Sequence, residues 1–579
     1  MNTYDIHIKG GTVVDGTRVP RFKADVWIKD GKIVQIGGRA EGTAARTIDA
    51  DGLIVAPGFV DLHTHYDAQI HWDPYCTISG WHGVTSVVLG NCGFGFAPVK
   101  PDFRERSMLT MTRTEAIPYE SMVEGMLPKW EWETIPEYLD CLERSDLGVN
   151  IIQYMPTASL MTYVMGLEKA KAGEPASPAE RKEMQRLLHE GMDAGLCGFS
   201  IQRLGPDSVQ ADFDATPMVT DIMHDEDILA LAEVLAERDE GCIQITQGTG
   251  DIKADLAFLE KLAKVAQRPI LHNVVAPARK DPEVHRRPLR WIDKCWAQGL
   301  PIYAQCGTGR AGFAFTLEHW NLYDASPAWR AVTTGTHDEK LAKMADPELR
   351  RALVEEAEEA DRRLQVIQAG VGGNPAGLVV QGVHNLDNLR QHEGRTVGDI
   401  ATEQGKHPIE VMLDLSIEGD LQVEFLGPDK GSNAEFMGEM MQSPYGIPGV
   451  SDGGAHTKFF TGGAYTTDFL KWLVRDEGTV TLEEAHYRLS ALAAHAAGFR
   501  DRGVLREGAA ADVVVYKMEE LDIEPNWIGE AVHDLPGGEW RRVQRAKGYQ
   551  QIIVNGEITF EEGECTGALP GRLLRHGRG

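Results

Sequence analysis

Residues 54–65 read Ile54-Val55-Ala56-Pro57-Gly58-Phe59-Val60-Asp61-Leu62-His63-Thr64-His65. This apolar, strand-forming run ends in two histidines two positions apart, and side chains two apart on a strand point to the same side. Both imidazoles should therefore face one cavity. Neutral imidazole is a common zinc ligand, and two imidazoles on one rigid strand end are positioned at little entropic cost. The stretch therefore predicts a metal site at the end of a buried strand.

The composition describes a large acidic protein. The chain has 579 residues, 42% of them hydrophobic, and 58 basic against 87 acidic residues give a net charge of −29. This charge argues against nucleic acid or an anionic membrane as a partner. We find no run of about 20 apolar residues and no signal peptide, and the eight cysteines include no Cys-x-x-Cys pair. We expect a cytoplasmic protein with reduced thiols that acts on a small molecule.

The two ends of the chain share one pattern of short strands and turns. Residues 1 to about 55 contain several such strands, and Ala511–Tyr516 and Gln551–Glu557 repeat the pattern near the C-terminus. We expect residues 1–55 and 501–579 to form the two halves of one small β-sandwich, with the C-terminal tail included in the second half.

Between them, residues 56–500 alternate apolar strand candidates with helical stretches, which is typical of βα units around a parallel sheet. Helix start signals stand at Ser177 and Thr481, and the charged stretch Asp346–Arg363 reads as a solvated helix within an insertion over about 306–370. The fold class is α/β, and with the opening strand the number of candidates is close to the eight of a (β/α)8 TIM-type barrel. The other strand candidates are Ser86–Gly90, Asn150–Met155, Gly198–Ile201, Cys242–Thr246, Pro269–Val275, Pro301–Gln305, Leu378–Val383 and Gly449–Ser451.

Three further residues at strand ends can carry chemistry. Cys92 follows the second strand among glycines, His272 lies within the sixth strand, and Asp452 follows the last one. Each has a structural alternative: a buried thiol, a core histidine, and a turn or helix-capping aspartate. Taken together with His63, four strand ends offer metal-binding or proton-transferring groups to one face of the barrel.

Six short motifs are spread along the chain: Ala56–His65, Gly90–Gly93, Gly198–Ser200, Glu393–Thr396, Ser451–Gly453 and Thr566–Arg572. In these motifs the chain resembles the amidohydrolase superfamily, and within it the N-acyl-D-amino-acid deacylase (D-aminoacylase) branch. The resemblance runs nearly end to end. It implies that His63 and His65 hold one metal, that Cys92 is a ligand or bridge, that His272 is the sixth-strand ligand, and that Asp452 is the general acid/base.

Two segments depart from that branch. The fifth strand has no histidine, and Thr246 or Gln247 offers only a weak oxygen ligand in its place. We therefore expect one zinc ion rather than two, with another divalent metal as the alternative. Met155–Leu160 also differs from the Gly-His segment and arginine of the branch. The groups considered for binding a substrate are Arg203, Arg310, Lys458 and His456.

The expected activity is hydrolysis of a C–N amide bond, in an N-acyl-D-amino acid or a related N-acyl compound, with Asp452 accepting and returning a proton. Two alternatives stay open. One is a cyclic amide (hydantoin- or dihydropyrimidine-like) or lactone hydrolase, and the other is a metal-free scaffold that has kept the fold. A homo-oligomer is also possible, because large barrel enzymes are commonly symmetric oligomers.

Overall fold

Eight parallel strand positions form the barrel of the computed structural model, which describes residues 2–38, 42–208, 210–278, 281–310, 313–319, 322–363, 375–383, 386–427, 432–459, 462–525 and 529–576. The third position is split between two short strands on either side of Tyr154. The barrel strands are β6 (Phe59–Asp61), β7 (Val84–Leu89), β8 (Asn150–Gln153) with β9 (Met155–Pro156), β10 (Gly198–Arg203), β11 (Cys242–Gln247), β12 (Ile270–Val275), β13 (Ile302–Gly307) and β17 (Gly446–Gly449).

The barrel closes where the first strand meets the last. Beyond β6 and β17, Thr64 and Gly453 form a parallel bridge. Two backbone hydrogen bonds flank this bridge: the amide of Asp452 donates to the carbonyl of His63 over 3.1 Å, and that of His65 donates to Gly453 over 2.7 Å. The histidine pair and the aspartate predicted from the sequence therefore lie on adjacent strand ends.

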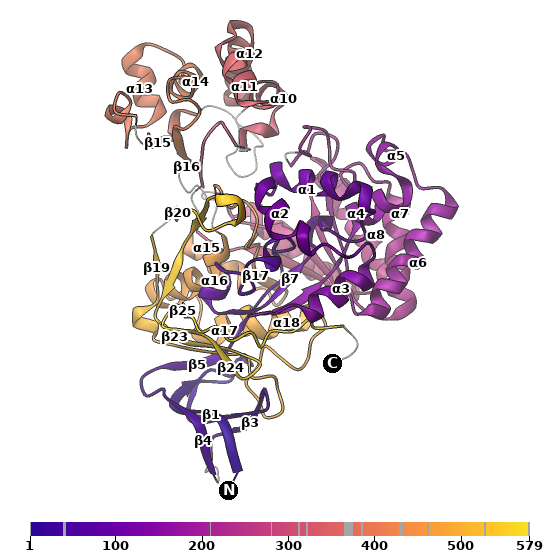
Figure 1. Cartoon of the computed structure of the whole chain (residues 1–579), viewed down its shortest axis with the longest axis vertical. Coiled ribbons are helices and arrows are strands. Elements are labelled where there is room, and N and C mark those ends of the chain that lie inside the picture. The colour runs from indigo at the N-terminus through magenta and orange to yellow at the C-terminus, as the bar shows by residue number, and fades with distance from the viewer. Residues whose placement is uncertain are drawn as a thin grey trace.

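Helices cover the outside of the barrel, as Figure 1 shows for α3 (Ile135–Arg144), α6 (Pro178–Ala194), α7 (Asp225–Arg238) and α8 (Ile252–Ala266). β7 is buried along its whole length, as expected of a parallel strand covered on both faces. The predicted start of α6 is confirmed: the Ser177 hydroxyl accepts from the amide of Glu180, and the Glu180 carboxylate accepts from that of Ser177.

Both ends of the chain contribute to one nine-stranded sheet. β5 (Ile54–Pro57) runs parallel to β1 (Asn2–Val13) and antiparallel to β18 (Val513–Tyr516), so the sheet is built across the two termini. Apolar side chains from both ends share one core. The remaining strands are β2 (Phe22–Lys29), β3 (Lys32–Ile36), β4 (Gly42–Asp49), β23 (Tyr549–Val554), β24 (Glu557–Glu561) and β25 (Glu564–Cys565).

The opening stretch connects this sheet to the barrel. Its first half is β5, in the terminal sheet, and its second half is β6, in the barrel. Gly58 joins them at a close contact, because a Cβ atom there would lie 2.3 Å from the side chain of Thr85. The change of sheet therefore depends on a residue without a side chain.

An insertion leaves the barrel after β13 and returns before β17. It has its own apolar core and stands apart from the barrel in Figure 1, at the end of the molecule opposite the N-terminus. The described parts extend well past the expected range of about 306–370, whose end lies outside the described residues. Its elements are β14 (Phe313–Phe315), α10 (Pro327–Thr333), α11 (His337–Ala345), α12 (Pro347–Arg363), β15 (Val379–Gly382), α13 (Val397–Gln404), α14 (Pro408–Glu418) and β16 (Glu424–Gly427).

One predicted barrel strand is wrong. The run Leu378–Val383 forms β15, which pairs antiparallel with β16 inside the insertion instead of joining the barrel. A short apolar run has the same pattern in either sheet, so its sequence does not tell which sheet it joins. Removing it from the candidates leaves the eight strand positions that the structure contains.

Candidate metal centre

His63 and His65 are buried side by side at the end of the first barrel strand. Each side chain is about 1% exposed, and the ring centroids lie 5.5 Å apart. The hydroxyl of Thr64, between them, turns away and donates to the carbonyl of Val88 over 2.7 Å. The Ser451 hydroxyl donates to the carbonyl of His63 over 2.9 Å. Bonds from the neighbouring strand ends thus hold the histidine pair in position.

Cys92 completes a set of three metal-binding side chains with this pair. It lies in a short 3₁₀ turn after β7 with a left-handed φ of 56°, and its amide donates to the Gln244 side chain over 2.8 Å. The Cys92 sulfur lies 3.4 Å from Nε2 of His63. One donor atom from each of Cys92, His63 and His65 fits within a 4.8 Å spread, which suits one ion bound by nitrogen and sulfur.

Asp452 faces the two histidines from the end of the last strand. Its Oδ1 lies 3.3 Å from Nε2 of His63 and 3.7 Å from Nε2 of His65. Its side chain is 22% exposed, against 1–2% for the two histidines, so the carboxylate stands at the more open side of the centre. A carboxylate in this position can meet both an ion and an incoming substrate.

The predicted ligand His272 points to the wrong side of its strand. In the register of β12 it is paired with Ile245 and Ala304, and its ring lies 6.4 Å from that of Trp291 on α9 (Glu283–Ala297). His272 therefore packs between the barrel and its outer helices. The prediction recognised the strand but missed the alternation of its side chains.

The next residue, Asn273, faces the barrel interior instead. It is paired with Thr246 and Gln305 in the sheet, and its Nδ2 donates to Oγ1 of Thr246 over 3.0 Å. Thr246 in turn lies 3.2 Å from the Cys92 sulfur. The Gln305 side chain reaches His63, with its Oε1 3.4 Å from Nδ1. Strands five, six and seven thus contribute hydroxyl and amide groups here.

Of the two oxygen ligands considered on the fifth strand, Thr246 lies at the centre. The Gln247 side chain turns away, and its Nε2 donates to Oδ1 of Asp255 over 3.0 Å. A neutral hydroxyl is a weak zinc ligand compared with imidazole or thiolate. The centre therefore depends on the first, second and last strands for strong ligands.

A buried carboxylate that the sequence analysis missed lies beside the histidines. Glu115 follows α1 (Arg104–Arg113), is 2% exposed, and places Oε2 3.9 Å from Nε2 of both His65 and His456. His456, predicted to contact substrate, thus lies at the centre. No local pattern marks Glu115, because a glutamate in a loop is most often exposed. The fold alone buries it.

Charge balance at the centre favours a bound cation. Burial lowers the pKa of His63, and burial together with the neighbouring His63 lowers that of His65, which keeps both rings in the neutral form that binds metals. Burial, with Glu115 adding to it, raises the pKa of the Cys92 thiol. Burial and the nearby Asp452 raise the pKa of Glu115. A cation would offset the cost of ionising these groups.

The family model of the amidohydrolase family matches residues 46–560. The chain belongs to this family. A D-aminoacylase of Alcaligenes xylosoxydans xylosoxydans is 24% identical over 99% of this chain and 97% of its own length. An uncharacterised protein of Mycobacterium tuberculosis is 26% identical over 99% of this chain and 96% of its own length.

A solved structure shares the fold of this amidohydrolase. The N-acyl-D-glutamate deacylase from Bordetella bronchiseptica, complexed with zinc and a phosphonate inhibitor, aligns with a TM-score of 0.64 at 22% identity. The alignment covers 99% of this chain and all of that one. The protein is a hydrolase that acts on C–N bonds, with the barrel and β-domain architecture predicted from the sequence.

Three cations considered for substrate binding in the amidohydrolase are held by carboxylates. Arg203 pairs with Asp225 at 2.5 Å. Arg310 pairs with Asp468 at 2.6 Å, and Lys458 with Glu539 at 2.6 Å. Each also lies over an aromatic ring, which fixes its direction further. His456, the fourth predicted substrate contact, lies at the centre, with its Nε2 3.9 Å from Oε2 of Glu115 and 3.8 Å from Oδ2 of Asp452.

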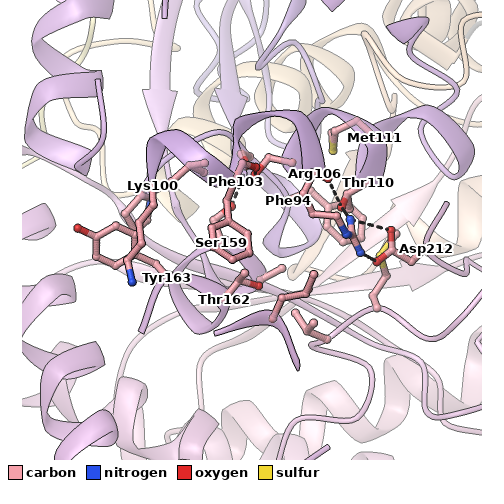
Figure 2. Close-up of a pocket in the computed structure, with 18 residues that line it drawn as sticks. Phe94, Lys100, Phe103, Arg106, Thr110, Met111, Ser159, Thr162, Tyr163 and Asp212 are labelled. Carbon is pink, nitrogen blue, oxygen red and sulfur yellow. Dashed lines mark hydrogen bonds and ion pairs between the residues drawn. The ribbon is translucent and has the colours of Figure 1, made fainter. Parts of the chain in front are cut away.

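Phe94 is one of the residues that line a pocket (Figure 2). Its ring centroid lies 6.4 Å from that of His65. In Figure 2 the Lys100 and Tyr163 side chains stand at one end and the Arg106–Asp212 pair at the other. The wall between them is largely apolar, with a few hydroxyls from α4 (Thr157–Met165). Its apolar members are Phe94, Pro98, Val99, Phe103, Met111, Ala158, Leu167, Met218 and Val219.

None of the described helices is long and apolar enough to cross a membrane.

Proposed function

We propose that this amidohydrolase removes the acyl group from an N-acyl-D-amino acid or a related N-acyl compound. The single observation that carries the proposal is the position of Asp452, which faces both buried histidines at the open side of the centre. The relatives named above support this substrate class, because two of them carry the names D-aminoacylase and N-acyl-D-glutamate deacylase.

The residues present fit one zinc ion. His63, His65 and Cys92 supply two nitrogens and a sulfur, and the carboxylate of Asp452 lies within reach as a fourth ligand. Two imidazoles and a thiolate favour zinc over magnesium or calcium, which prefer oxygen ligands. When bound, such an ion lowers the pKa of water to about 7 and polarises a carbonyl.

Asp452 is the group positioned to move protons. Its carboxylate accepts the proton of the attacking water and returns it to the nitrogen of the departing amine, so that one side chain acts first as base and then as acid. Gln305 and Ser451 hold His63 on either side, through its ring nitrogen and its carbonyl. These contacts keep the ring fixed while charge develops next to it.

The pocket beside Phe94 suits the acyl chain of such a substrate. Its wall is largely apolar, as an acyl chain requires, and its lining residue Phe94 has its ring centroid 6.4 Å from that of His65. Lys100 at one end, with its ammonium 5.1 Å from the centre of the Tyr163 ring, is available to a polar terminus.

A substrate panel with the zinc-loaded enzyme tests the proposal. We expect hydrolysis of N-acyl-D-amino acids, with the L-isomers slower, and little turnover of hydantoins, dihydropyrimidines or lactones. A preference for a cyclic amide or a lactone would contradict the proposed substrate class and leave the metal centre in place. Absence of stoichiometric metal from the purified protein would contradict both and favour a scaffold.

A further inference from the structure

Two loops that border the metal centre also contribute side chains to the core of the insertion. Ala116 follows Glu115 directly, and Phe459 lies three residues after His456. Both Ala116 and Phe459 are 6% exposed, and they pack in the same apolar cluster as Phe315 of β14. The insertion stands apart from the barrel in Figure 1, yet its core reaches the loops that carry Glu115 and His456.

A buried ion pair fixes the first of these loops to the insertion. Arg113, the last residue of α1, places Nη2 2.9 Å from Oδ2 of Asp324, which lies in a short 3₁₀ helix of the insertion (Leu322–Ala325). The side chains of Arg113 and Asp324 are 10% and 1% exposed. The hydroxyl of Thr333 on α10 also donates to Asp324, so the carboxylate is anchored within the insertion. Such a pair holds its two segments together, because separating them would leave a buried charge without a partner.

Backbone hydrogen bonds join the second loop both to the insertion and to the first loop. The amide of Ala314, on β14, donates to the carbonyl of Phe459 over 3.1 Å. The amide of His456 donates to the carbonyl of Glu115 over 2.5 Å. Each loop is thus bonded to the other loop and to the insertion.

The second loop starts at Asp452 and carries His456 beside it. Nε2 of His456 lies 3.8 Å from Oδ2 of Asp452, and its ring centroid lies 4.9 Å from that of Phe459. The ring therefore neighbours both the carboxylate that we propose to move protons and a residue of the insertion core. His456 also has a left-handed φ of 57°, which a residue with a side chain keeps only when its surroundings enforce it.

We propose that Asp324 of the insertion is a positioning residue for the metal centre. Through Arg113 it holds the loop that carries Glu115, and this loop holds His456 against the carboxylate of Asp452. Asp324 acts through these residues and not on the substrate. A displacement of about 1 Å caused by a distant substitution can cost roughly 10²-fold in rate, so contacts this far from the reaction can matter. The inference rests on the proposed function, which assigns Asp452 its role in proton transfer.

Kinetics of the zinc-loaded full-length protein test the positioning role. Asp324→Asn keeps the size of the side chain and removes its charge, so we expect kcat for an N-acyl-D-amino acid to fall by about threefold to thirtyfold. KM and bound zinc should not change. In a His456→Gln background the same substitution should cost less than about twofold, because the ring through which it acts is gone. An unchanged kcat in Asp324→Asn, or equal losses in both backgrounds, overturns the role.

The insertion offers a matched control for this substitution. Asp414 pairs with Arg350 over 2.7 Å, and both residues lie on helices of the insertion, α14 and α12. Asp414→Asn therefore removes a charge of the same kind from an ion pair that does not reach the barrel loops. It should leave kcat unchanged in both backgrounds. A loss of kcat equal to that of Asp324→Asn would mean that any weakening of the insertion has this effect, and would overturn the role of Asp324.

Hydrogen exchange separates this inference from the proposed function, because it needs no substrate. Backbone amides of residues 452–459 should exchange faster in zinc-loaded Asp324→Asn than in the wild type, and at the wild-type rate in Asp414→Asn. Equal exchange in all three proteins overturns the inference alone. A wild type that shows the exchange difference from Asp324→Asn but hydrolyses no N-acyl-D-amino acid overturns the proposed function and supports the link between the insertion and the loop.

A milder variant decides the matter if Asp324→Asn does not fold. Ala116→Gly removes the methyl group that packs in the insertion core, and glycine suits the φ of 51° at this position. It should speed exchange over residues 452–459 and lower kcat. Ala215→Gly is its control, because Ala215 also has a positive φ, of 65°, and lies outside that core. This control should change neither quantity, and identical behaviour of the two glycine variants would overturn the inference.

Discussion

Oδ1 of Asp452 lies 3.3 Å from Nε2 of His63, although the two residues follow the last and the first strands of the barrel. The closure of the barrel produces this proximity, because the first and last strands end side by side. The carboxylate that we propose to move protons and the imidazole that we propose to bind the ion are thus fixed by one pair of adjacent strand ends.

Replacing Asp452 tests its role in proton transfer. Asp452→Asn keeps the shape of the side chain and an oxygen ligand but removes the base, so we expect kcat to fall by about 10²–10⁴-fold while the zinc ion stays bound. Steady-state kinetics with metal analysis on the same sample measures both. Asp225→Asn is the control. It changes only the carboxylate that pairs with Arg203, so most of the activity should remain. Wild-type kcat in the Asp452→Asn enzyme would rule out the role.

The cysteines offer a matched pair for the metal site. Cys92 and Cys76 are both buried, but only Cys92 belongs to the cluster with the two histidines. Cys92→Ser should weaken zinc binding by about tenfold or more, because a serine hydroxyl is a poor zinc ligand at neutral pH. Cys76→Ser should leave zinc affinity unchanged, whatever it does to stability. Competition against a chromophoric chelator measures both affinities, and equal affinities would place the thiolate outside the site.

His272 and His63 offer a second pair of positions for comparing zinc content between variants. Because His272 faces Trp291 on the outer side of the barrel, His272→Gln should keep the full zinc content and cost less than about 2 kcal/mol of stability. His63→Gln should lose zinc. Metal analysis after gel filtration shows the difference. Zinc loss from the His272 variant, with its fold intact by circular dichroism, would mean that the sixth-strand histidine reaches the ion after all.

The pocket beside Phe94 predicts how chain length affects the rate. Thr162→Phe places a ring inside the pocket, so kcat/KM for N-acyl substrates with long acyl chains should fall much more than for N-acetyl substrates. Glu168→Phe adds the same ring on the next helix, outside the pocket lining. It should leave the chain-length profile unchanged. A uniform loss for all chain lengths in Thr162→Phe would show that the acyl chain binds elsewhere.

A buried histidine away from the metal centre predicts that the folded protein loses stability in acid. Burial lowers the pKa of His82 to about 4, and the ring bonds the hydroxyl of Thr467 and the carbonyl of Gln544 in its neutral form. The unfolded chain binds this proton at about pH 6.5, so stability is complete above that pH and is lost as the pH falls towards 4. Thermal unfolding of the chelated protein across this range should show the loss.

The size of this effect follows from the shift of the pKa. A shift of the His82 pKa from 6.5 to about 4 corresponds to a loss of roughly 3 kcal/mol in the free energy of unfolding as the pH falls through this range. His82→Gln removes the hydrogen bonds of the ring to Thr467 and Gln544, so it should lower stability at pH 7.5. Because glutamine does not titrate, the variant should also flatten the dependence of stability on pH between 6.5 and 4. If the variant and the wild type lose stability in parallel over that range, the acid sensitivity arises from other groups.

Local sequence patterns sufficed for the parts of the fold that depend on neighbouring residues. The His63 and His65 pair at a strand end, the Ser177 helix start and the strand-rich termini all follow from short-range spacing and turn chemistry. The chain passes from the terminal sheet to the barrel between β5 and β6, close to the change of pattern that the sequence placed between residues 55 and 56.

The predictions that failed depend on contacts between residues that lie far apart in the sequence. His272 and Asn273 differ by one position, and only the register with neighbouring strands decides which of them faces the centre. Glu115 is a buried carboxylate whose loop meets a distant one, joined by the hydrogen bond from the amide of His456 to the carbonyl of Glu115. Leu378–Val383 pairs with β16 in the insertion rather than with a strand of the barrel. In each case the deciding neighbour lies far away in the sequence, where periodicity carries no information.

Hydrolysis of an N-acyl-D-amino acid by protein stripped of metal and then reloaded with zinc tests the central claim most directly. The claim predicts no release of free amino acid from the stripped protein, full recovery when one equivalent of zinc binds, and no recovery in Asp452→Asn at equal zinc content. Equal turnover before and after removal of the metal would contradict it.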